Sequence, residues 1–297
     1  MRNSAKNALK LFEKFLCAGL PFLHLFLHNI RMPDARLENE GGFLFDDLPP
    51  PKTAAPKSVM WNLWHGCLKY SEGCQNCYVY RGDKKWGRDS RDVRKTVLFD
   101  MPLERYANGD YKYPSGSQFW TCFSSDFFLE DAGADMWRRE AWRMMRERGD
   151  CAFFFITKRI LRFRECIPAD WGAGYENVTI GVTCENQRRA GERLPFFRDI
   201  PAARKVFIHE PLLSPLDISA HLFRGVERVV AGGESGENAR PCRYEWFLSL
   251  RDQCAAARVP FVFKQTGARF IKDGKLYVIP RRLQHIQAAK ANINYTP

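Results

Sequence analysis

The sequence predicts an α/β fold, a full or partial (β/α) barrel of parallel strands that follows an irregular N-terminal extension. Short apolar runs rich in β-branched and aromatic residues alternate with longer helical segments seven times, without sheet-reversing hairpins between them. Nearly every run ends in polar or glycine-rich residues. A barrel lines its C-terminal mouth with residues from many strands, whereas an open doubly wound sheet concentrates ligands at one switch point. The repeated polar ends therefore favour a barrel.

The predicted strands, in chain order, are residues 59–64, 118–123, 152–157, 178–183, 205–209, 228–231 and 260–264. Between them, residues 135–148 and residues 244–257 repeat apolar side chains at the spacing of one helix face. The 297 residues, 45% of them hydrophobic, can bury a sizeable core. We interpret residues 58–297 as one domain.

Residues 1–57 are expected to be an appendage that is partly disordered or precedes the native start codon. Residues 15–30 resemble the apolar core of a signal peptide, but two His and a Pro interrupt a run already too short to span a bilayer. The chain's 10 cysteines show no spacing typical of a small disulfide-bonded domain, which favours a reducing compartment. We therefore expect a cytoplasmic protein without membrane attachment.

Three cysteines form the most informative motif, with Cys67, Cys74 and Cys77 spaced as C-x6-C-x2-C. Structural zinc normally takes four protein ligands, whereas three thiolates leave a position open for a substrate or cofactor. Two alternatives remain: three buried free cysteines brought close by chance, or a zinc site completed by a distant residue such as His65. Glycines directly before Cys67 and Cys74 favour a loop that turns tightly around a centre.

The charge of the chain is concentrated near its C-terminus. The formal net charge is +12, and residues 258–297 carry eight Lys or Arg against the single Asp273. A basic surface of this kind attracts phosphates, so we expect a nucleic-acid substrate to bind there. The alternative is a solvated tail, because no motif of a nucleic-acid-reading module accompanies it.

A parallel (β/α) repeat whose first strand runs into a three-cysteine loop resembles the radical S-adenosylmethionine superfamily, whose fold is a full or partial TIM-like barrel. The resemblance implies that Cys67, Cys74 and Cys77 hold a four-iron four-sulfur cluster as metal ligands. It also implies that S-adenosylmethionine binds the open iron and is cleaved to a 5′-deoxyadenosyl radical by an electron from a partner such as flavodoxin or ferredoxin. The chain departs from the superfamily in its six-residue first gap and in Asn76, where an aromatic residue is common.

Further motifs resemble an uncharacterised phage-associated family named for phage gene products thirty-seven and sixty-eight, over about residues 60–295. They are WNLWHGC, GCQNCY, FSSDFFLED, ITKR, GVTCENQ, EPLL, GGESG and FKQTG. Two of them, FSSDFFLED and ITKR, also resemble strand ends of the spore photoproduct lyase-like branch, which repairs DNA.

The resemblance implies roles for residues at the strand ends. The cofactor-binding residues would be Tyr78, Ser124, Ser125, Asp126, Gly232, Gly233 and Glu234. Among them, Asp126 suits the ammonium of S-adenosylmethionine, and the Gly-Gly-Glu run would approach the adenosine or the substrate. Lys158 and Arg159 would meet a carboxylate or a phosphate. Cys184 is a candidate hydrogen-atom donor, with its thiol expected to face the barrel opening.

The leading hypothesis is a cytoplasmic radical S-adenosylmethionine enzyme that acts on nucleic acid or another phosphorylated substrate. The alternative is a non-catalytic, phage-derived protein that binds nucleic acid and holds zinc through the three cysteines and His65. A zinc hydrolase is disfavoured, because the chain lacks a general-base motif such as H-E-x-x-H.

Overall fold

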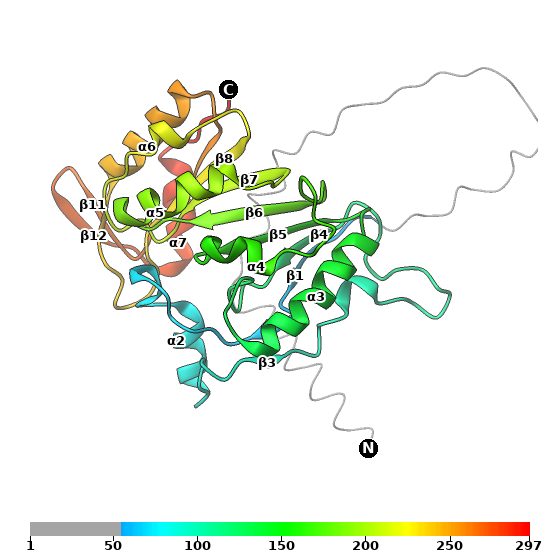
Figure 1. Cartoon of the computed structure of the whole chain (residues 1–297). Coiled ribbons are helices and arrows are strands. Elements are labelled where there is room, and N and C mark those ends of the chain that lie inside the picture. The colour runs from blue at the N-terminus through cyan, green and yellow to red at the C-terminus, as the bar shows by residue number, and fades with distance from the viewer. Residues whose placement is uncertain (1–54) are drawn as a thin grey trace, which may run out of the picture. The chain divides into compact units, whose positions relative to one another are not determined.

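The computed structural model describes residues 55–297, and its central element is a parallel sheet of seven strands (Figure 1). In spatial order the strands are β1 (Ser58–Trp61), β4 (Gln118–Thr121), β5 (Ala152–Thr157), β6 (Val178–Thr183), β7 (Arg204–His209), β8 (Val226–Gly232) and β10 (Phe261–Gln265). The spatial order equals the chain order. Each connection therefore moves one position along the sheet, as successive βα units do.

The seven predicted strands are all present, and the predicted α/β architecture is confirmed. The bounds of β5 and β6 are those that the sequence predicted, while β1 and β4 end two or three residues earlier than expected. Strands β1 and β10 form the two edges of the sheet and do not pair with each other within residues 55–297. The sheet is thus a curled half-barrel, the partial form of the two that were expected.

Helices α3 (Ala132–Glu147), α4 (Phe163–Cys166), α5 (Gln187–Asp199) and α6 (Tyr244–Ala256) lie against one face of the sheet (Figure 1). The core between the two layers is largely aromatic. The rings of Phe247 in α6 and Phe263 in β10 have centroids 4.3 Å apart, and Phe119 and Phe153 stack at 5.0 Å. Aromatic pairs of this kind add to the free energy gained by burying apolar area.

The other face of the sheet carries a second, smaller apolar cluster. Val206, Ile208 and Val230 are buried there, with Phe154, Ile156 and Val262 partly buried against them. Successive side chains of a strand point to opposite faces, so Phe155 and Phe207 pack under the helices while their chain neighbours line the inner face. The inner face of the half-barrel is therefore apolar at these positions, and the polar residues lie beyond the ends of the strands.

Two excursions leave this framework. Between β1 and β4, β2 (Trp64–His65) pairs antiparallel with β3 (Arg94–Lys95) and encloses the 3-10 turn η2 (Glu72–Cys74) and helix α2 (Tyr78–Lys85). After β8, β9 (Cys242–Arg243), β11 (Arg269–Lys272) and β12 (Lys275–Val278) form a small sheet, followed by α7 (Arg281–Lys290). The expectation of no reversing hairpins therefore holds for the main sheet only.

The expectations for the N-terminal extension fall almost wholly on residues 1–54, which lie outside the described residues. In the part that the structure describes, no helix combines the length and the apolar character needed to cross a membrane.

Candidate active site at the carboxyl edge of the sheet

The cysteine loop, residues 66–77, joins β2 to α2 and carries Cys67, Cys74 and Cys77 as free, half-buried thiols. Its entrance is fixed by backbone contacts. Gly66 has a φ of +101°, and a Cβ there would lie 2.6 Å from the carbonyl oxygen of Asp92, so only glycine fits. The amide of Cys67 donates to the carbonyl of Ser90 at 2.7 Å, and the hydroxyl of Tyr80 donates to the carbonyl of Cys67 at 2.5 Å.

The residues that follow β4 also contact the start of the cysteine loop. The hydroxyl of Ser124 donates to the carbonyl of Trp64 at 2.9 Å, and the hydroxyl of Ser125 donates to the carbonyl of Gly66. The amide of Ser124 donates to the side chain of Asn62 at 2.9 Å. Both predicted serines thus lie beside the cysteine loop, where they position it.

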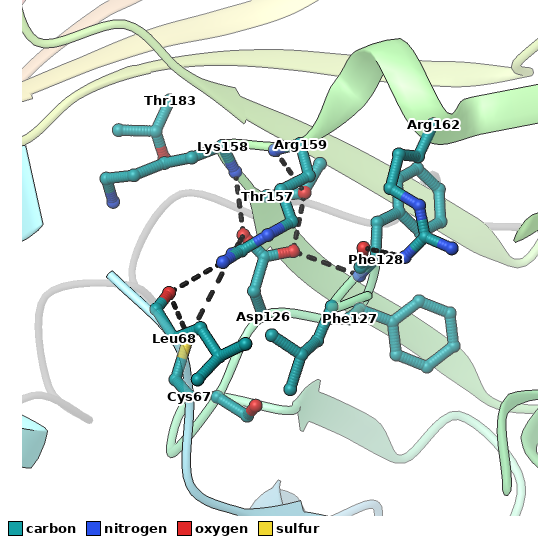
Figure 2. A network of polar contacts seen from close by, with 12 residues as sticks. Cys67, Leu68, Asp126, Phe127, Phe128, Thr157, Lys158, Arg159, Arg162 and Thr183 are labelled. Carbon is teal, nitrogen blue, oxygen red and sulfur yellow. Dashed lines mark hydrogen bonds and ion pairs between the residues drawn. The ribbon is translucent and has the colours of Figure 1, made fainter. Parts of the chain in front are cut away.

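Asp126 and Arg159 form a buried ion pair that reaches the first cysteine (Figure 2). The two charged groups are 3.2 Å apart, and both side chains are more than nine-tenths buried. From this pair, the Arg159 guanidinium donates to the carbonyl of Leu68 at 2.6 Å and lies 4.0 Å from Sγ of Cys67. The Arg159 guanidinium therefore connects the segments that follow β4 and β5 to the cysteine loop.

The carboxylate of Asp126 is fully engaged. Its Oδ1 accepts from the amide of Phe128 at 2.9 Å and from the hydroxyl of Thr157 at 2.6 Å (Figure 2). Its Oδ2 accepts from the amide of Lys158 at 3.0 Å and pairs with Arg159. With four partners, this carboxylate holds the segments after β4 and β5 together.

The thiol of Cys67 is strongly influenced by its surroundings. Burial, the negative charge of Asp126 and the neighbouring Cys74 and Cys77 raise its pKa to about 12, although the positive charge of Arg159 opposes them. The three sulfur atoms are thus close enough to act on one another. Among residues 55–297, however, no group of three or more His, Cys, Asp or Glu side chains is gathered closely enough to hold a metal ion. The donor chemistry of three free thiols suits iron–sulfur clusters and zinc.

The side chain of Lys158 packs against Gly73 of the cysteine loop. A Cβ at Gly73 would be 3.2 Å from Cε of Lys158 and 3.2 Å from the carboxyl carbon of Glu185, so both side chains pack directly on Gly73. Burial opposes the charge of Lys158, but the charges of Cys74, Glu185 and Asp126 outweigh burial and raise its pKa. Among the described residues, this ammonium makes no hydrogen bond.

Glu185, a polar residue after the fourth predicted strand, was assigned no role from the sequence, yet it is the most enclosed carboxylate of the site. It accepts from the amide of Gly73 at 3.1 Å and pairs with Arg193 at 2.8 Å, and it is wholly buried. Burial opposes its ionisation, but the charges of Arg193 and Lys158 outweigh burial and hold its pKa below the usual value. Glu185 follows β6 and Arg193 lies eight positions further along the chain in α5, so the pair does not have the three- or four-residue spacing of neighbours on a helix surface.

The Gly-Gly-Glu run at the end of β8 also contacts the cysteine loop. Asn76, the residue that departs from the superfamily pattern, donates to the carboxylate of Glu234 at 2.9 Å. Arg240 pairs with the same carboxylate at 2.5 Å, and these hydrogen bonds hold the pKa of Glu234 below its usual value against the effect of burial. A Cβ at Gly233 would lie 2.2 Å from the carbonyl oxygen of Thr266, so this glycine permits a close backbone approach.

Tyr78 and Cys184 occupy different environments from those of the charged residues. Tyr78 is largely exposed, and its hydroxyl donates to the carbonyl of Phe123. Cys184 is wholly buried in the hydrophobic core under the helices, so the expectation that its thiol faces the opening is wrong. It lies on the same face of the chain as Ile180 and Val182, which also pack in that core.

The fold and the site define an α/β half-barrel whose strand ends converge on a three-cysteine loop. A family model described as "Protein of unknown function (DUF5131)" matches residues 57–292, and the chain belongs to this family. No curated protein matches the chain. No solved structure matches it either.

Proposed function

We propose that the protein is an iron–sulfur enzyme of the radical S-adenosylmethionine type. One observation carries the proposal: three free cysteines lie on one loop that is hydrogen-bonded to the ends of β4, β5, β6 and β8 of a parallel half-barrel. Ligands of barrels bind at the carboxyl ends of the strands. Three thiolates suit a cluster that keeps one iron open.

In this proposal Cys67, Cys74 and Cys77 would hold a four-iron four-sulfur cluster. Such a cluster would supply one-electron reduction of S-adenosylmethionine, with a partner such as flavodoxin or ferredoxin as the source of the electron. The remaining steps belong to the chain's own residues. Arg159 donates to Leu68 and holds the loop in place. Lys158, whose ammonium is free of hydrogen bonds among the described residues, binds the carboxylate of S-adenosylmethionine.

In this proposal Asp126 mainly positions neighbouring residues, rather than binding the ammonium of S-adenosylmethionine. With four partners already present, its carboxylate serves the cofactor mainly by holding Arg159 and the backbone that carries Lys158. Glu234 is engaged by Asn76 and Arg240 in the same way. Asp126, through Arg159, therefore holds the loop near its start at Leu68, and Glu234 holds it near its end at Asn76.

The deciding experiment is anaerobic reconstitution of the full chain with iron and sulfide, followed by addition of a reductant and S-adenosylmethionine. We expect a brown protein that releases 5′-deoxyadenosine, and we expect Cys74→Ala to abolish both properties. Cys166→Ala, which removes a buried thiol outside the loop, is the matched control and should leave both unchanged. A colourless protein that releases no 5′-deoxyadenosine would reject the proposal.

A zinc protein remains the second candidate because of one pair of residues. Nε2 of His65 lies 2.9 Å from the carboxylate of Asp83, which leaves only Nδ1 for a metal. Metal-binding histidines commonly have their other ring nitrogen oriented by a carboxylate. This candidate predicts one zinc ion per chain after purification, no visible absorbance, and loss of zinc in His65→Gln. Retention of iron by His65→Gln would favour the cluster instead.

A further inference from the structure

The basic C-terminal segment folds into a hairpin that has an unusual surface. Strands β11 and β12 pair antiparallel, and the two turn residues Asp273 and Gly274 both have positive φ, 51° and 74°. This is the backbone of a two-residue type I′ turn, for which Asp-Gly is a preferred sequence. The segment is therefore ordered, and the alternative of a solvated tail does not apply to it.

One strand of this hairpin is anchored, while the other projects. Phe270 of β11 is buried and packs against Phe247 and Phe263, with ring centroids 5.9 Å and 6.0 Å away. Within the part of the chain that the structure describes, strand β12 pairs on one side only, and all four of its residues are exposed. Leu276, Tyr277 and Val278 are 42%, 41% and 75% exposed, respectively. Three consecutive exposed apolar side chains on an edge strand contribute little to folding, and they are typical of an interaction surface.

The charge around β12 indicates the kind of partner. Five cations lie on β11, on β12 and at the start of α7, and among residues 55–297 none of them has a carboxylate within 4.0 Å; they are Arg269, Lys272, Lys275, Arg281 and Arg282. The ammonium of Lys275 lies 5.3 Å from the ring centre of Tyr277, so a cation and an exposed ring are presented together. Aromatic rings that stack on bases, flanked by cations that contact phosphates, are the means by which proteins bind single-stranded nucleic acid.

The hairpin is also connected to the candidate site. It follows β10 directly, and the amide of Ala268 donates to the carbonyl of Glu234 at 2.8 Å. The side chain of Glu234 in turn accepts from Asn76 of the cysteine loop. The residues that precede the hairpin are thus linked through Glu234 to the loop that carries the three cysteines.

We propose that the β11–β12 hairpin binds single-stranded nucleic acid, with Tyr277 stacking on a base and Lys272 and Lys275 contacting phosphates. Single-stranded nucleic acid would then be the substrate of the proposed enzyme. Only the reaction of the bound strand, and not its binding, rests on the proposed function. Binding itself needs no cluster, so the two proposals can fail separately.

The test uses the full chain, both stripped of metal and reconstituted, and a labelled single-stranded oligonucleotide of about 20 nucleotides, longer than one binding site. Binding is measured by fluorescence anisotropy from ~50 to ~200 mM salt, with the matching duplex as comparison. Lys272→Gln combined with Lys275→Gln should lower the slope of log affinity against log salt by about 1.4, at about 0.7 per phosphate contact. Tyr277→Ala should weaken binding about 5- to 150-fold, the range for loss of one stacked base.

Matched controls separate a local effect from a change in net charge or aromatic content. Arg139→Gln combined with Arg224→Gln removes two exposed cations elsewhere, and Tyr106→Ala removes a tyrosine that is 51% exposed. Both controls should bind like the unaltered protein. The inference is overturned if the full chain binds no single strand at ~50 mM salt, if the hairpin variants bind like the controls, or if the duplex binds more tightly and Tyr277→Ala has no effect. Release of 5′-deoxyadenosine by a protein that binds no nucleic acid would reject this inference and leave the proposed function standing.

Discussion

The guanidinium of Arg159 lies 3.2 Å from the carboxylate of Asp126, and its remaining donors reach the carbonyl of Leu68, more than ninety residues away in the chain. A buried ion pair is costly to desolvate and persists only where further hydrogen bonds satisfy its atoms. Thr157 and the amides of Phe128 and Lys158 supply them. The pair therefore fixes where Cys67 lies relative to the sheet.

Replacing Asp126 by Ala should destabilise the protein more than replacing Arg159 by Met. Loss of the carboxylate leaves a buried guanidinium unpaired, which costs about 3–5 kcal/mol, whereas Asp126 keeps three other donors when Arg159 is removed. Urea unfolding measures both free energies. Asp89→Ala, which breaks an exposed pair with Arg91, is the control and should leave the free energy of unfolding nearly unchanged. Equal losses at Asp126 and Asp89 would contradict the anchoring role.

Each of the substitutions Cys67→Ala, Cys74→Ala and Cys77→Ala should abolish iron binding while the sheet stays folded. The three thiols lie on a loop at the edge of the sheet rather than in the core. Iron content after anaerobic reconstitution and circular dichroism check the two parts of this prediction. Full iron occupancy in two of the three variants would show that these cysteines are not the ligands.

The stability of the protein should fall as the pH is lowered from about 6.5 to 4 because of His209. Burial lowers the pKa of this wholly buried side chain from 6.5 to about 4, although its Nδ1 donates to the carbonyl of Cys184 at 2.7 Å. In that pH range the unfolded chain binds the proton and the folded chain does not, so acid favours unfolding. The full shift corresponds to roughly 3 kcal/mol.

The variant His209→Gln isolates this effect because it cannot take up the proton. Urea unfolding at several pH values should show a smaller loss of stability between pH 6.5 and 4 for the variant than for the unaltered protein. Identical pH profiles would mean that His209 does not remain neutral in the folded state.

Two glycine substitutions should act in opposite directions. Gly233→Ala places a Cβ 2.2 Å from the carbonyl oxygen of Thr266, and the overpacking should cost about 1–3 kcal/mol. A Cβ at Gly191, in the interior of α5, would meet no atom of the described residues within 4 Å, so Gly191→Ala should stabilise the protein by about 0.5–1 kcal/mol. Thermal unfolding of the two variants tests both signs. A stabilising Gly233→Ala would mean that the β8 and β10 ends are further apart than described.

The sequence by itself determined the seven strands and their parallel arrangement, since each apolar run and its polar end are local signals. It also determined the three-cysteine loop, because ligand spacing and turn-forming glycines are read directly from neighbouring residues. Serines and charged residues after β4 and β5 were expected at the mouth, and they lie there.

Only the tertiary structure decided which of these residues touch. Glu185 meets Gly73 across 112 positions, and Asn76 meets Glu234 across 158, distances in the chain over which no local pattern acts. All six residues of β6 are buried, so apolar and polar residues do not alternate along it in a way that identifies the face under the helices. Cys184 was therefore expected at the barrel opening, whereas it lies in the core under the helices. The exposed strand β12 likewise looks like an ordinary β-rich run in the sequence, because exposure depends on which neighbours the fold supplies on each side.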